Sequence, residues 1–315
     1  MSNKNIRVAV IGATGAVGTV TLELLAARGY TNVRALASSR SAGSTIQYDN
    51  ASIMVEEATP ELLSSGEFDL CFFSVGTGTS QSLVPHAIEG KALVIDKSDA
   101  FRLNDETPLV VAGVNNSAIK SYGIGSSRNI IANPNCSTIQ LACVLKPLHD
   151  AAGLESIKLA TYQSMSGKGD IGIEELKTTK PAEGNLGMDW DYDGEEFSEE
   201  TKLRAETQKI LGLPNLKISA NCVRVPILIG HAQAVWVKTA NPLSTEQAKK
   251  AFSESDNLAL EELPTPKDAA GLDKVMVGRI RKDSTDERSL ALWIVNDNLR
   301  KGAALNAVQI ADLLP

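Results

Sequence analysis

A strand, a glycine-rich turn and a helix near the start of the chain constrain the fold most. The apolar run at residues 6–11 is typical of a strand in the buried centre of a parallel sheet. Glycines 12, 15 and 18 follow, then a helical pattern at residues 20–28 and a second strand at 33–37. Such a turn lets the backbone approach a pyrophosphate at a helix N-terminus. The order favours dinucleotide binding over a merely tight turn.

Further strands are predicted at residues 69–74, 93–96 and 109–112, with helices between several of them. This alternation is typical of a doubly wound α/β domain of the Rossmann type. After residue 134 strands dominate, which predicts a mixed α+β domain. We expect strands near residues 154–165, 216–223, 227–239, 275–280 and 290–295, and helices near 199–211, 245–252 and 302–314. Residues 181–198 are acidic and aromatic without periodicity, and we expect a surface excursion there.

The predicted domains are residues 1–133 with 299–315, which would bind the dinucleotide, and residues 134–298, which would carry catalysis and dimerisation. At the end of the second strand, NAD enzymes usually have an acidic residue for the ribose 2′-hydroxyl. This chain has Ser38 and Arg40 there. A hydroxyl and a guanidinium suit the 2′-phosphate of NADP. The alternative is that Arg40 is a solvated loop residue.

A second turn places a cysteine where a helix should begin. A short strand at residues 130–132 precedes Asn133-Pro134-Asn135, which forces a turn because proline disfavours a helical residue before it. An apolar helical series follows Ser137. Cys136 would then lie beside free N–H groups and the positive end of the helix dipole, which lowers a thiol pKa. Cys136 is therefore a candidate nucleophile, and the alternative is a buried structural thiol.

The composition argues against several classes of function. The 315 residues are 43% hydrophobic and 22% charged, as in ordinary globular proteins. A formal net charge of −7 argues against nucleic-acid or anionic-membrane surfaces. No apolar run could cross a bilayer, and no signal segment is visible. The four cysteines and three histidines show no metal-ligand spacing, so we expect a cytoplasmic, reduced, metal-free protein.

Motifs along nearly the whole chain resemble those of the aspartate-β-semialdehyde dehydrogenase family. They are residues 12–18, 101–102, 133–138, 161–163, 166–167, 222–226, 230–231 and 297–304. The resemblance implies an oxidoreductase that reduces L-aspartyl 4-phosphate to L-aspartate 4-semialdehyde with NADPH and releases phosphate. Its products would feed lysine, threonine and methionine biosynthesis. It also implies a homodimer or a dimer of dimers.

The same resemblance assigns roles to individual residues. Cys136 would form the thioester, His231 would transfer protons, and Gln163 would orient the acyl group. An imidazole pKa near 6.5 suits proton transfer at neutral pH. Without the resemblance, a lone histidine between apolar strand residues would more often be part of the core.

The remaining assignments concern the substrate and the cofactor. Arg224 would hold the α-carboxylate as a planar fork, Glu199 would meet the ammonium, and Lys202 and Arg102 would bind phosphate. Asn135 completes the substrate-binding set. A Glu–Lys pair on a helix is otherwise usually a solvated face, and an isolated arginine such as Arg224 a surface cation. The expected cofactor-binding residues are Gly12, Thr14, Gly15, Ala16, Val17, Ser38, Arg40, Ser74, Gly76, Ser166, Gly167 and Asn298.

The chain departs from the family pattern near the substrate. Lys168 follows Ser166-Gly167 where a small residue is usual, and the segment at 170–198 is shorter than usual. Two alternatives therefore stay open. One is the same chemistry on another acyl phosphate or acyl thioester, and the other is a non-catalytic paralogue that binds NADP.

Overall fold

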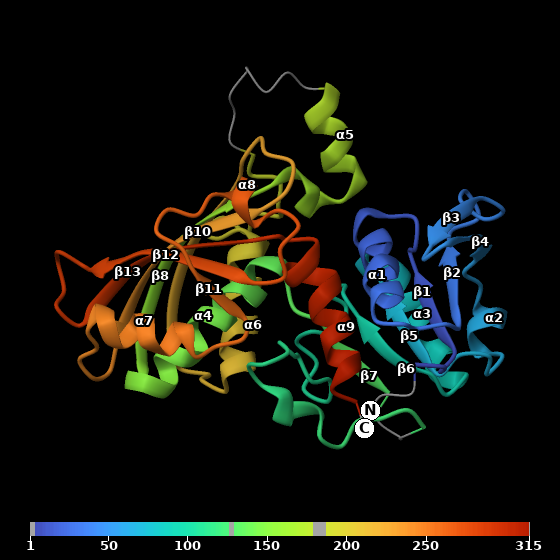
Figure 1. The fold of residues 1–315 in the computed structure, drawn as a ribbon, viewed down its shortest axis with the longest axis horizontal. Coiled ribbons are helices and arrows are strands. Elements are labelled where there is room, and N and C mark those ends of the chain that lie inside the picture. The colour runs from blue at the N-terminus through green and yellow to red at the C-terminus, as the bar shows by residue number, and fades with distance from the viewer. Residues whose placement is uncertain (1–3, 126–128, 179–186, 315) are drawn as a thin grey trace. The chain divides into compact units, whose positions relative to one another are not determined.

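The computed structural model describes residues 4–125, 129–178 and 187–314, and it consists of two units (Figure 1). The first unit runs to Pro134 and resumes at Ala303, and the second runs from Asn135 to Gly302. The sequence predicts boundaries between residues 133 and 134 and between residues 298 and 299. In the structure they lie between residues 134 and 135 and between residues 302 and 303. Residues 1–3 of the predicted first domain and 181–186 of the predicted excursion lie outside the described residues.

The first unit is built on a seven-stranded sheet with the order β3-β4-β2-β1-β5-β6-β7. Only the β3–β4 pair is antiparallel, and every other neighbouring pair is parallel. The predicted doubly wound α/β domain is confirmed. The strands are β1 (Val8–Ile11), β2 (Val33–Ala37), β3 (Thr45–Tyr48), β4 (Ala51–Glu57), β5 (Leu70–Phe73), β6 (Leu93–Asp96) and β7 (Ile130–Ala132).

The central strands β1 and β5 are apolar throughout because both of their faces are buried. Val8 and Val10 belong to one core, with α1 (Ala16–Ala27) and α9 (Leu305–Asp312). Ala9 and Ile11 belong to the other, with α2 (Pro60–Ser64) and α3 (Thr77–Glu89). Successive side chains of a strand point to opposite faces, so a continuous apolar run fills both cores.

The strand predicted at residues 109–112 is wrong. Only Leu109 forms a bridge, to Ala132. Beyond it, the backbone N–H groups of Val111 and Ala112 donate to the side chains of Asn115 and Asn306, both at 2.9 Å. Side-chain amides therefore replace a neighbouring strand as hydrogen-bond partners, which an apolar run cannot reveal.

The second unit contains a six-stranded mixed sheet with the order β11-β12-β13-β10-β8-β9. It confirms the predicted mixed α+β domain, although β11 and the short helices α5 and α8 were not predicted. The strands are β8 (Leu154–Gln163), β9 (Lys217–Arg224), β10 (His231–Thr239), β11 (Leu258–Leu260), β12 (Val275–Lys282) and β13 (Ser289–Asn296). The helices are α4 (Cys136–Ala152), α5 (Asp170–Thr178), α6 (Ser198–Leu211), α7 (Thr245–Ser253) and α8 (Pro266–Ala269).

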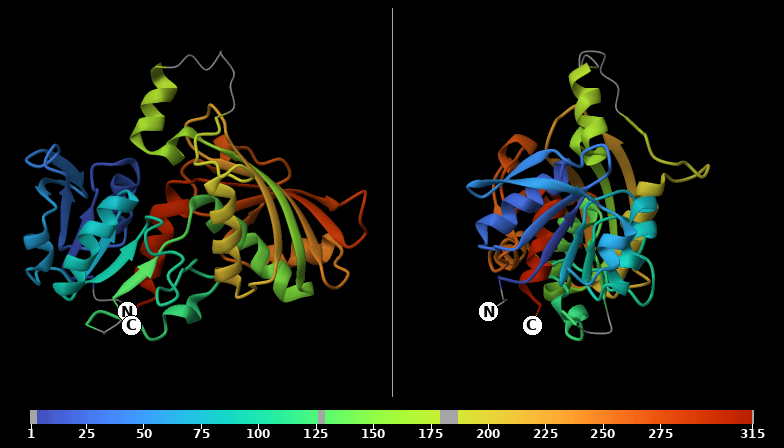
Figure 2. Two further views of the ribbon diagram at one scale, coloured as in Figure 1. Left: turned by 180° about the vertical axis from the view of Figure 1, so that it is seen from behind. Right: turned by 90° about the vertical axis from the view of Figure 1, so that its right-hand side faces the viewer.

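Helix α4 packs on the sheet and on α6 and α7 (Figures 1 and 2). Alternation along β10 shows which face is covered: Val235 and Val237 are fully buried, whereas Trp236 between them is 37% exposed. The helix predicted at 302–314 begins instead with a π-helical turn, Arg300–Ala304, before α9. The sheet and α4 together position the residues described below.

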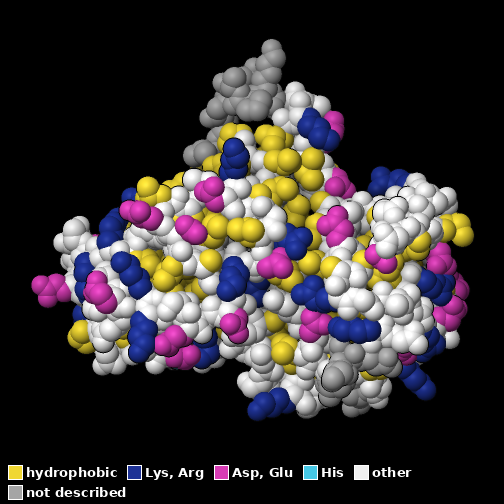
Figure 3. Space-filling view, viewed as in Figure 1, with side chains coloured by type: hydrophobic (Ala, Val, Ile, Leu, Met, Phe, Trp, Pro, Cys, Tyr) yellow, Lys and Arg dark blue, Asp and Glu magenta, His cyan; other side chains and the backbone are white. Residues whose placement is uncertain are grey.

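Charged side chains of both signs are interspersed over the face seen in Figure 3. Both signs are present on this face although the formal net charge of the chain is −7. Among the described helices, none is both long and apolar enough to span a membrane.

Candidate active site

Cys136 is the first residue of α4, as the sequence predicts. Asn135 caps this helix: its side-chain oxygen accepts the backbone N–H groups of Ser137 and Thr138 at 2.8 and 3.4 Å. Cys136 is only partly buried. Its sulfur lies at the positive end of a 17-residue helix, where negative charge is stabilised.

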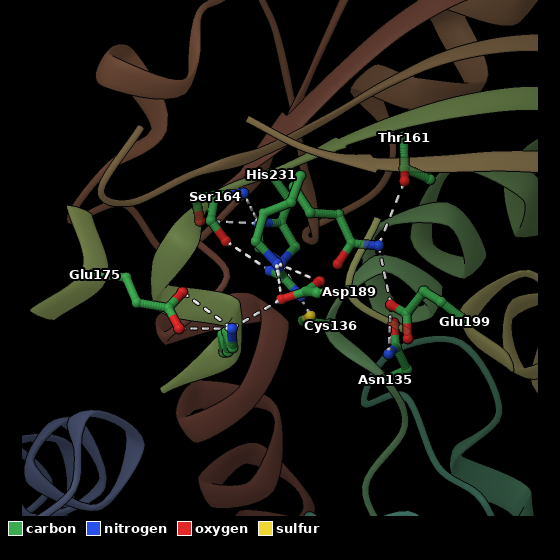
Figure 4. A network of polar contacts seen from close by, with 11 residues as sticks. Asn135, Cys136, Thr161, Ser164, Glu175, Asp189, Glu199 and His231 are labelled. Carbon is green, nitrogen blue, oxygen red and sulfur yellow. Dashed lines mark hydrogen bonds and ion pairs between the residues drawn. The ribbon is translucent and has the colours of Figure 1, made fainter. Parts of the chain in front are cut away.

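His231 begins β10 and points at this sulfur. Its Nε2 lies 3.1 Å from the Cys136 Sγ (Figure 4). The backbone N–H of Ser164 donates to Nδ1 at 3.0 Å. Because Nδ1 accepts this bond, a neutral imidazole must carry its proton on Nε2. The ring therefore directs an N–H toward the sulfur.

The pKa of His231 is not the ordinary value expected from the sequence. Burial of the ring and then the positive charge of Arg224 lower the pKa to about 3. His231 is fully buried, because β10 carries it into the interior of the second unit. The imidazole is consequently neutral at neutral pH, and in the resting site it acts as a hydrogen-bond donor.

Gln163, Glu199 and Asn135 form a connected chain beside the thiol (Figure 4). Glu199 Oε1 accepts bonds from Gln163 Nε2 and Asn135 Nδ2, both at 2.9 Å. Glu199 and Gln163 are 5% and 2% exposed, so Glu199 is not on a solvated helix face. The structure thus brings Cys136 and its capping residue Asn135 together with His231, Gln163 and Glu199. All five were predicted from the sequence.

Arg224 ends β9 and is also buried, at 5% exposure, rather than being a surface cation. Its Nη1 donates to the Ser164 carbonyl oxygen at 3.0 Å. Gly167 lies against both basic groups: a Cβ there would come within 3.0 Å of His231 Nε2 and 3.1 Å of Arg224 Nη1. Only glycine fits this position without displacing them.

The two predicted phosphate-binding residues belong to different units. Lys202 lies on α6 one turn after Glu199 and is partly buried. Arg102 lies in the first unit, where its Nε and Nη2 donate to the carbonyl oxygens of Asn133 and Lys97 at 3.1 and 2.7 Å. These bonds fix the guanidinium beside the end of β7.

The glycine turn of the first unit fits a dinucleotide phosphate group. Gly12 has a φ of 81°, and a Cβ on it would lie 2.4 Å from the Ser74 carbonyl oxygen. A Cβ on Gly18 would lie 2.0 Å from the Gly12 oxygen. Gly15 is the N-cap residue of α1 and has no side chain to cap the helix. The backbone N–H groups of Ala16 and Val17 are therefore left to bind an anion. The turn is therefore tight, and its helix end is suited to phosphate.

Other predicted cofactor residues surround this turn. Thr14 contacts Ser41 at 3.5 Å, which connects the turn to the loop holding Ser38 and the exposed Arg40. Ser74 has a buried hydroxyl without a hydrogen-bond partner among the described residues, and Gly76 caps α3 with no side-chain bond. A buried hydroxyl of this kind is the orphaned group that a ligand would satisfy.

Ser166, Gly167 and Asn298 lie in the second unit. The Asn298 side-chain amide forms three hydrogen bonds there: it accepts from Ser164 Oγ at 3.0 Å and Gly230 N at 2.9 Å, and it donates to Ser166 Oγ at 2.9 Å. These bonds give Asn298 a role in holding the loops around His231. Its contact with a cofactor stays a prediction.

Sequence reasoning missed three residues of the site. Ser164 fixes the His231 tautomer, and its only signal was its place directly after Gln163. Asp189 contacts Arg224 Nε at 3.0 Å, and the Trp190 ring lies 4.8 Å from the Arg224 guanidinium carbon. Both belong to the segment predicted as a surface excursion. Met188 and residues 191–195 are exposed, as predicted, while Asp189 and Trp190 contact Arg224. In the described part of the chain, no group of His, Cys, Asp and Glu residues could hold a metal ion.

Comparisons with known proteins agree with this geometry. Residues 7–122 match the family "Semialdehyde dehydrogenase, NAD binding domain", and residues 145–301 match "Semialdehyde dehydrogenase, dimerisation domain". The aspartate-semialdehyde dehydrogenase of Corynebacterium glutamicum is 41% identical, and the match covers 98% of each chain. Its alignment spans 345 positions, more than the 315 residues of this chain, so the relative has segments that this chain lacks.

Two solved structures of relatives are complexes with a ligand. The aspartate semialdehyde dehydrogenase II of Vibrio cholerae complexed with ASA has a TM-score of 0.92, with 40% identity over 99% of this chain and 98% of that one. The enzyme of Candida albicans with NADP has a TM-score of 0.79, with 27% identity over 98% of both chains. The nucleotide-binding unit, the cysteine–histidine pair and these matches agree, and the chain belongs to the aspartate-semialdehyde dehydrogenase family of oxidoreductases.

Proposed function

We propose that this chain reduces L-aspartyl 4-phosphate to L-aspartate 4-semialdehyde with NADPH, through a thioester on Cys136, and releases phosphate. The observation that carries the proposal is the 3.1 Å contact between Cys136 Sγ and His231 Nε2 at the N-terminus of α4. The Vibrio cholerae relative, which is complexed with ASA, supports the choice of substrate.

The chemistry requires a sulfur nucleophile that is also a good leaving group. The Cys136 thiolate attacks the acyl carbon, the C–S bond forms, and the C–O bond to phosphate breaks with its electrons going to phosphate. NADPH, when bound, supplies the hydride that reduces the acyl carbon. The C–S bond then breaks, the sulfur recovers its electron pair, and the aldehyde leaves. Gln163, held by Glu199, is placed to orient the acyl group.

His231 assists through the proton on Nε2. Because Nδ1 accepts the Ser164 N–H, the neutral ring holds its single proton at Nε2 and acts there as a hydrogen-bond donor. A neutral donor beside the sulfur stabilises the thiolate without adding a buried positive charge. The same N–H is available to oxygen as negative charge develops on the substrate.

Charged residues of the second unit suit the two ends of an amino acid. Arg224 presents a planar guanidinium to the α-carboxylate, and the Glu199 carboxylate suits the ammonium. Lys202 and Arg102 are proposed to hold the phosphate.

We infer that the cofactor is NADP. The turn around Gly12 and the α1 N-terminus suit the pyrophosphate, and the exposed Arg40 at the end of β2 suits the 2′-phosphate. The Candida albicans relative, whose structure is with NADP, supports this choice.

We also propose a homodimer formed through the face of the second sheet opposite α4. The matched dimerisation domain supports it. This face carries the exposed Trp236 and the stacked pair Tyr162–Trp293, whose ring centroids are 5.6 Å apart. Aromatic side chains on a sheet face are typical of an interface core.

The first prediction tests the reaction. Aspartate semialdehyde, phosphate and NADP should give NADPH absorbance, and Cys136→Ser should lose almost all turnover while still binding NADP, because a serine alcohol is a poor nucleophile without a strong base. Lys202→Ala should raise the KM for phosphate in the same assay. Intact-protein mass spectrometry with acyl phosphate and no NADPH should find an adduct on Cys136. Normal reduction without such an adduct contradicts the thioester.

The second prediction concerns pH. With its pKa lowered to about 3, His231 binds a proton only far below pH 6.5, so its ring nitrogens should not titrate between pH 5 and 8. Long-range ¹H–¹⁵N NMR of the three histidines should show a constant Nε2–H tautomer for His231 over this pH range. A titration of His231 near pH 6.5 would contradict the structure.

The third prediction concerns the cofactor. Arg40→Ala should weaken NADP binding about tenfold or more, since a charge-assisted hydrogen bond contributes about 1.5–3 kcal/mol, and should leave NAD binding nearly unchanged. Dissociation constants from NAD(P)H fluorescence measure both. Lys120→Ala, which removes another exposed cation of the first unit, is the control. An equal loss for both cofactors rules out the contact.

The fourth prediction concerns assembly. The wild-type protein should sediment as twice 33.5 kDa, and Trp236→Glu should shift it toward the monomer because it buries an unpaired charge. Leu260→Glu replaces a residue of similar exposure, 39%, on the edge strand β11 and should stay dimeric. A Trp236→Glu dimer of wild-type affinity would place the interface elsewhere.

A further inference from the structure

Residues 187–190, called here the clamp segment, hold the end of β9 by backbone bonds. The Gly187 N–H donates to the Arg224 carbonyl oxygen at 2.9 Å, and the Arg224 N–H donates to the Gly187 oxygen at 2.8 Å. A Cβ on Gly187 would lie 3.3 Å from the Arg224 Cβ. The segment therefore lies directly against the arginine that is proposed to bind the substrate carboxylate.

Two side chains of the clamp segment contact the guanidinium itself. The Arg224 Nε donates to Asp189 at 3.0 Å to Oδ1 and 3.3 Å to Oδ2. The Trp190 ring centroid lies 4.8 Å from the Arg224 Cζ, within the range of a cation–π contact. With the Ser164 oxygen on Nη1, the guanidinium is held on one face and at two of its nitrogens.

Asp189 is itself held by a cation. Lys168 Nζ lies 3.3 Å from Asp189 Oδ2 and also pairs with Glu175 at 2.8 Å (Figure 4). Burial alone would raise the pKa of Asp189, but Arg224 and Lys168 outweigh it and lower the pKa below its usual value. The carboxylate is therefore charged at neutral pH.

A guanidinium has five N–H donors in a fixed plane. The bonds described for Arg224 use Nε and one hydrogen of Nη1. As far as the described residues go, the Nη2 nitrogen and the second Nη1 hydrogen face no other hydrogen-bond acceptor. Together they form the end-on fork that binds a carboxylate bidentately. Asp189 closes the Nε edge and leaves this fork open.

We propose that Asp189 and Trp190 are positioning residues that fix Arg224 so that its terminal nitrogens receive the substrate carboxylate. The inference rests on the proposed function. The opposite arrangement, in which Asp189 occupies the carboxylate position and competes with substrate, fits less well. Asp189 contacts Nε rather than the terminal fork, and Lys168 holds it there.

The test uses Asp189→Asn in the full-length protein, assayed with aspartate semialdehyde, phosphate and NADP. The KM for the semialdehyde should rise about tenfold, which corresponds to about 1.4 kcal/mol, with little change in kcat or in NADP affinity. Asp191→Asn, an exposed carboxylate two residues later, is the matched control and should match the wild type. Asp189→Glu keeps the charge and should recover part of the loss.

A double-mutant cycle separates positioning from general damage. Arg224→Lys removes the planar fork, so Asp189→Asn should have almost no further effect on KM in that background. Trp190→Leu should raise the KM for the semialdehyde while leaving the Asp189 charge in place. This variant replaces Asp189→Asn as the test if Asp189→Asn does not fold.

The outcomes are distinct. An unchanged or lower KM in Asp189→Asn overturns the proposal, and a lower one indicates competition. The same increase with and without Arg224→Lys also overturns it, because the effect would not pass through the arginine. A wild-type protein without activity toward the semialdehyde would refute the proposed function instead.

Discussion

The hydrogen bond from the Ser164 backbone N–H to Nδ1 of His231 is the constraint on which the second unit's chemistry depends. It selects the ring nitrogen that carries the proton. The same residue accepts Arg224 Nη1 on its carbonyl oxygen and donates its hydroxyl to Asn298. A single residue after β8 thus couples His231 to the proposed carboxylate anchor, and a shift of this backbone would misplace both at once.

Helix α6 supports Asn135, the residue directly before the proposed nucleophile Cys136. Glu199 binds the Asn135 side chain at 2.9 Å, and Glu206 accepts the Asn135 backbone N–H at 2.7 Å. Asn135 in turn caps α4, so two buried carboxylates fix the residue that begins the helix. Each buried carboxylate costs free energy of desolvation, which these hydrogen bonds offset.

The sequence was sufficient for features that depend on local pattern. The glycine turn, the strands with continuous apolar runs and the helix after Asn135 could all be predicted, and the family resemblance pointed to Cys136, His231 and Arg224. The strand at 109–112 was mispredicted because Asn306, distant in sequence, supplies its hydrogen bonds. Ser164 acts through its backbone, and Asp189 through a contact 35 residues away in sequence. Neither leaves a periodic signal, and the low pKa of His231 reflects burial that only the fold determines.

The return of the chain to the first unit at Ala303 has a consequence for the order of synthesis. Leu305, Val308 and Ile310 of α9 belong to the core that also contains Val8 and Val10 of β1. Strand β1 therefore cannot complete this core until α9 has left the ribosome, whereas the second unit has all its strands earlier. The unit begun second is thus the first that can finish folding, and a chain shortened before α9 would leave part of one apolar face of the first sheet, the part not covered by α1, open to aggregation.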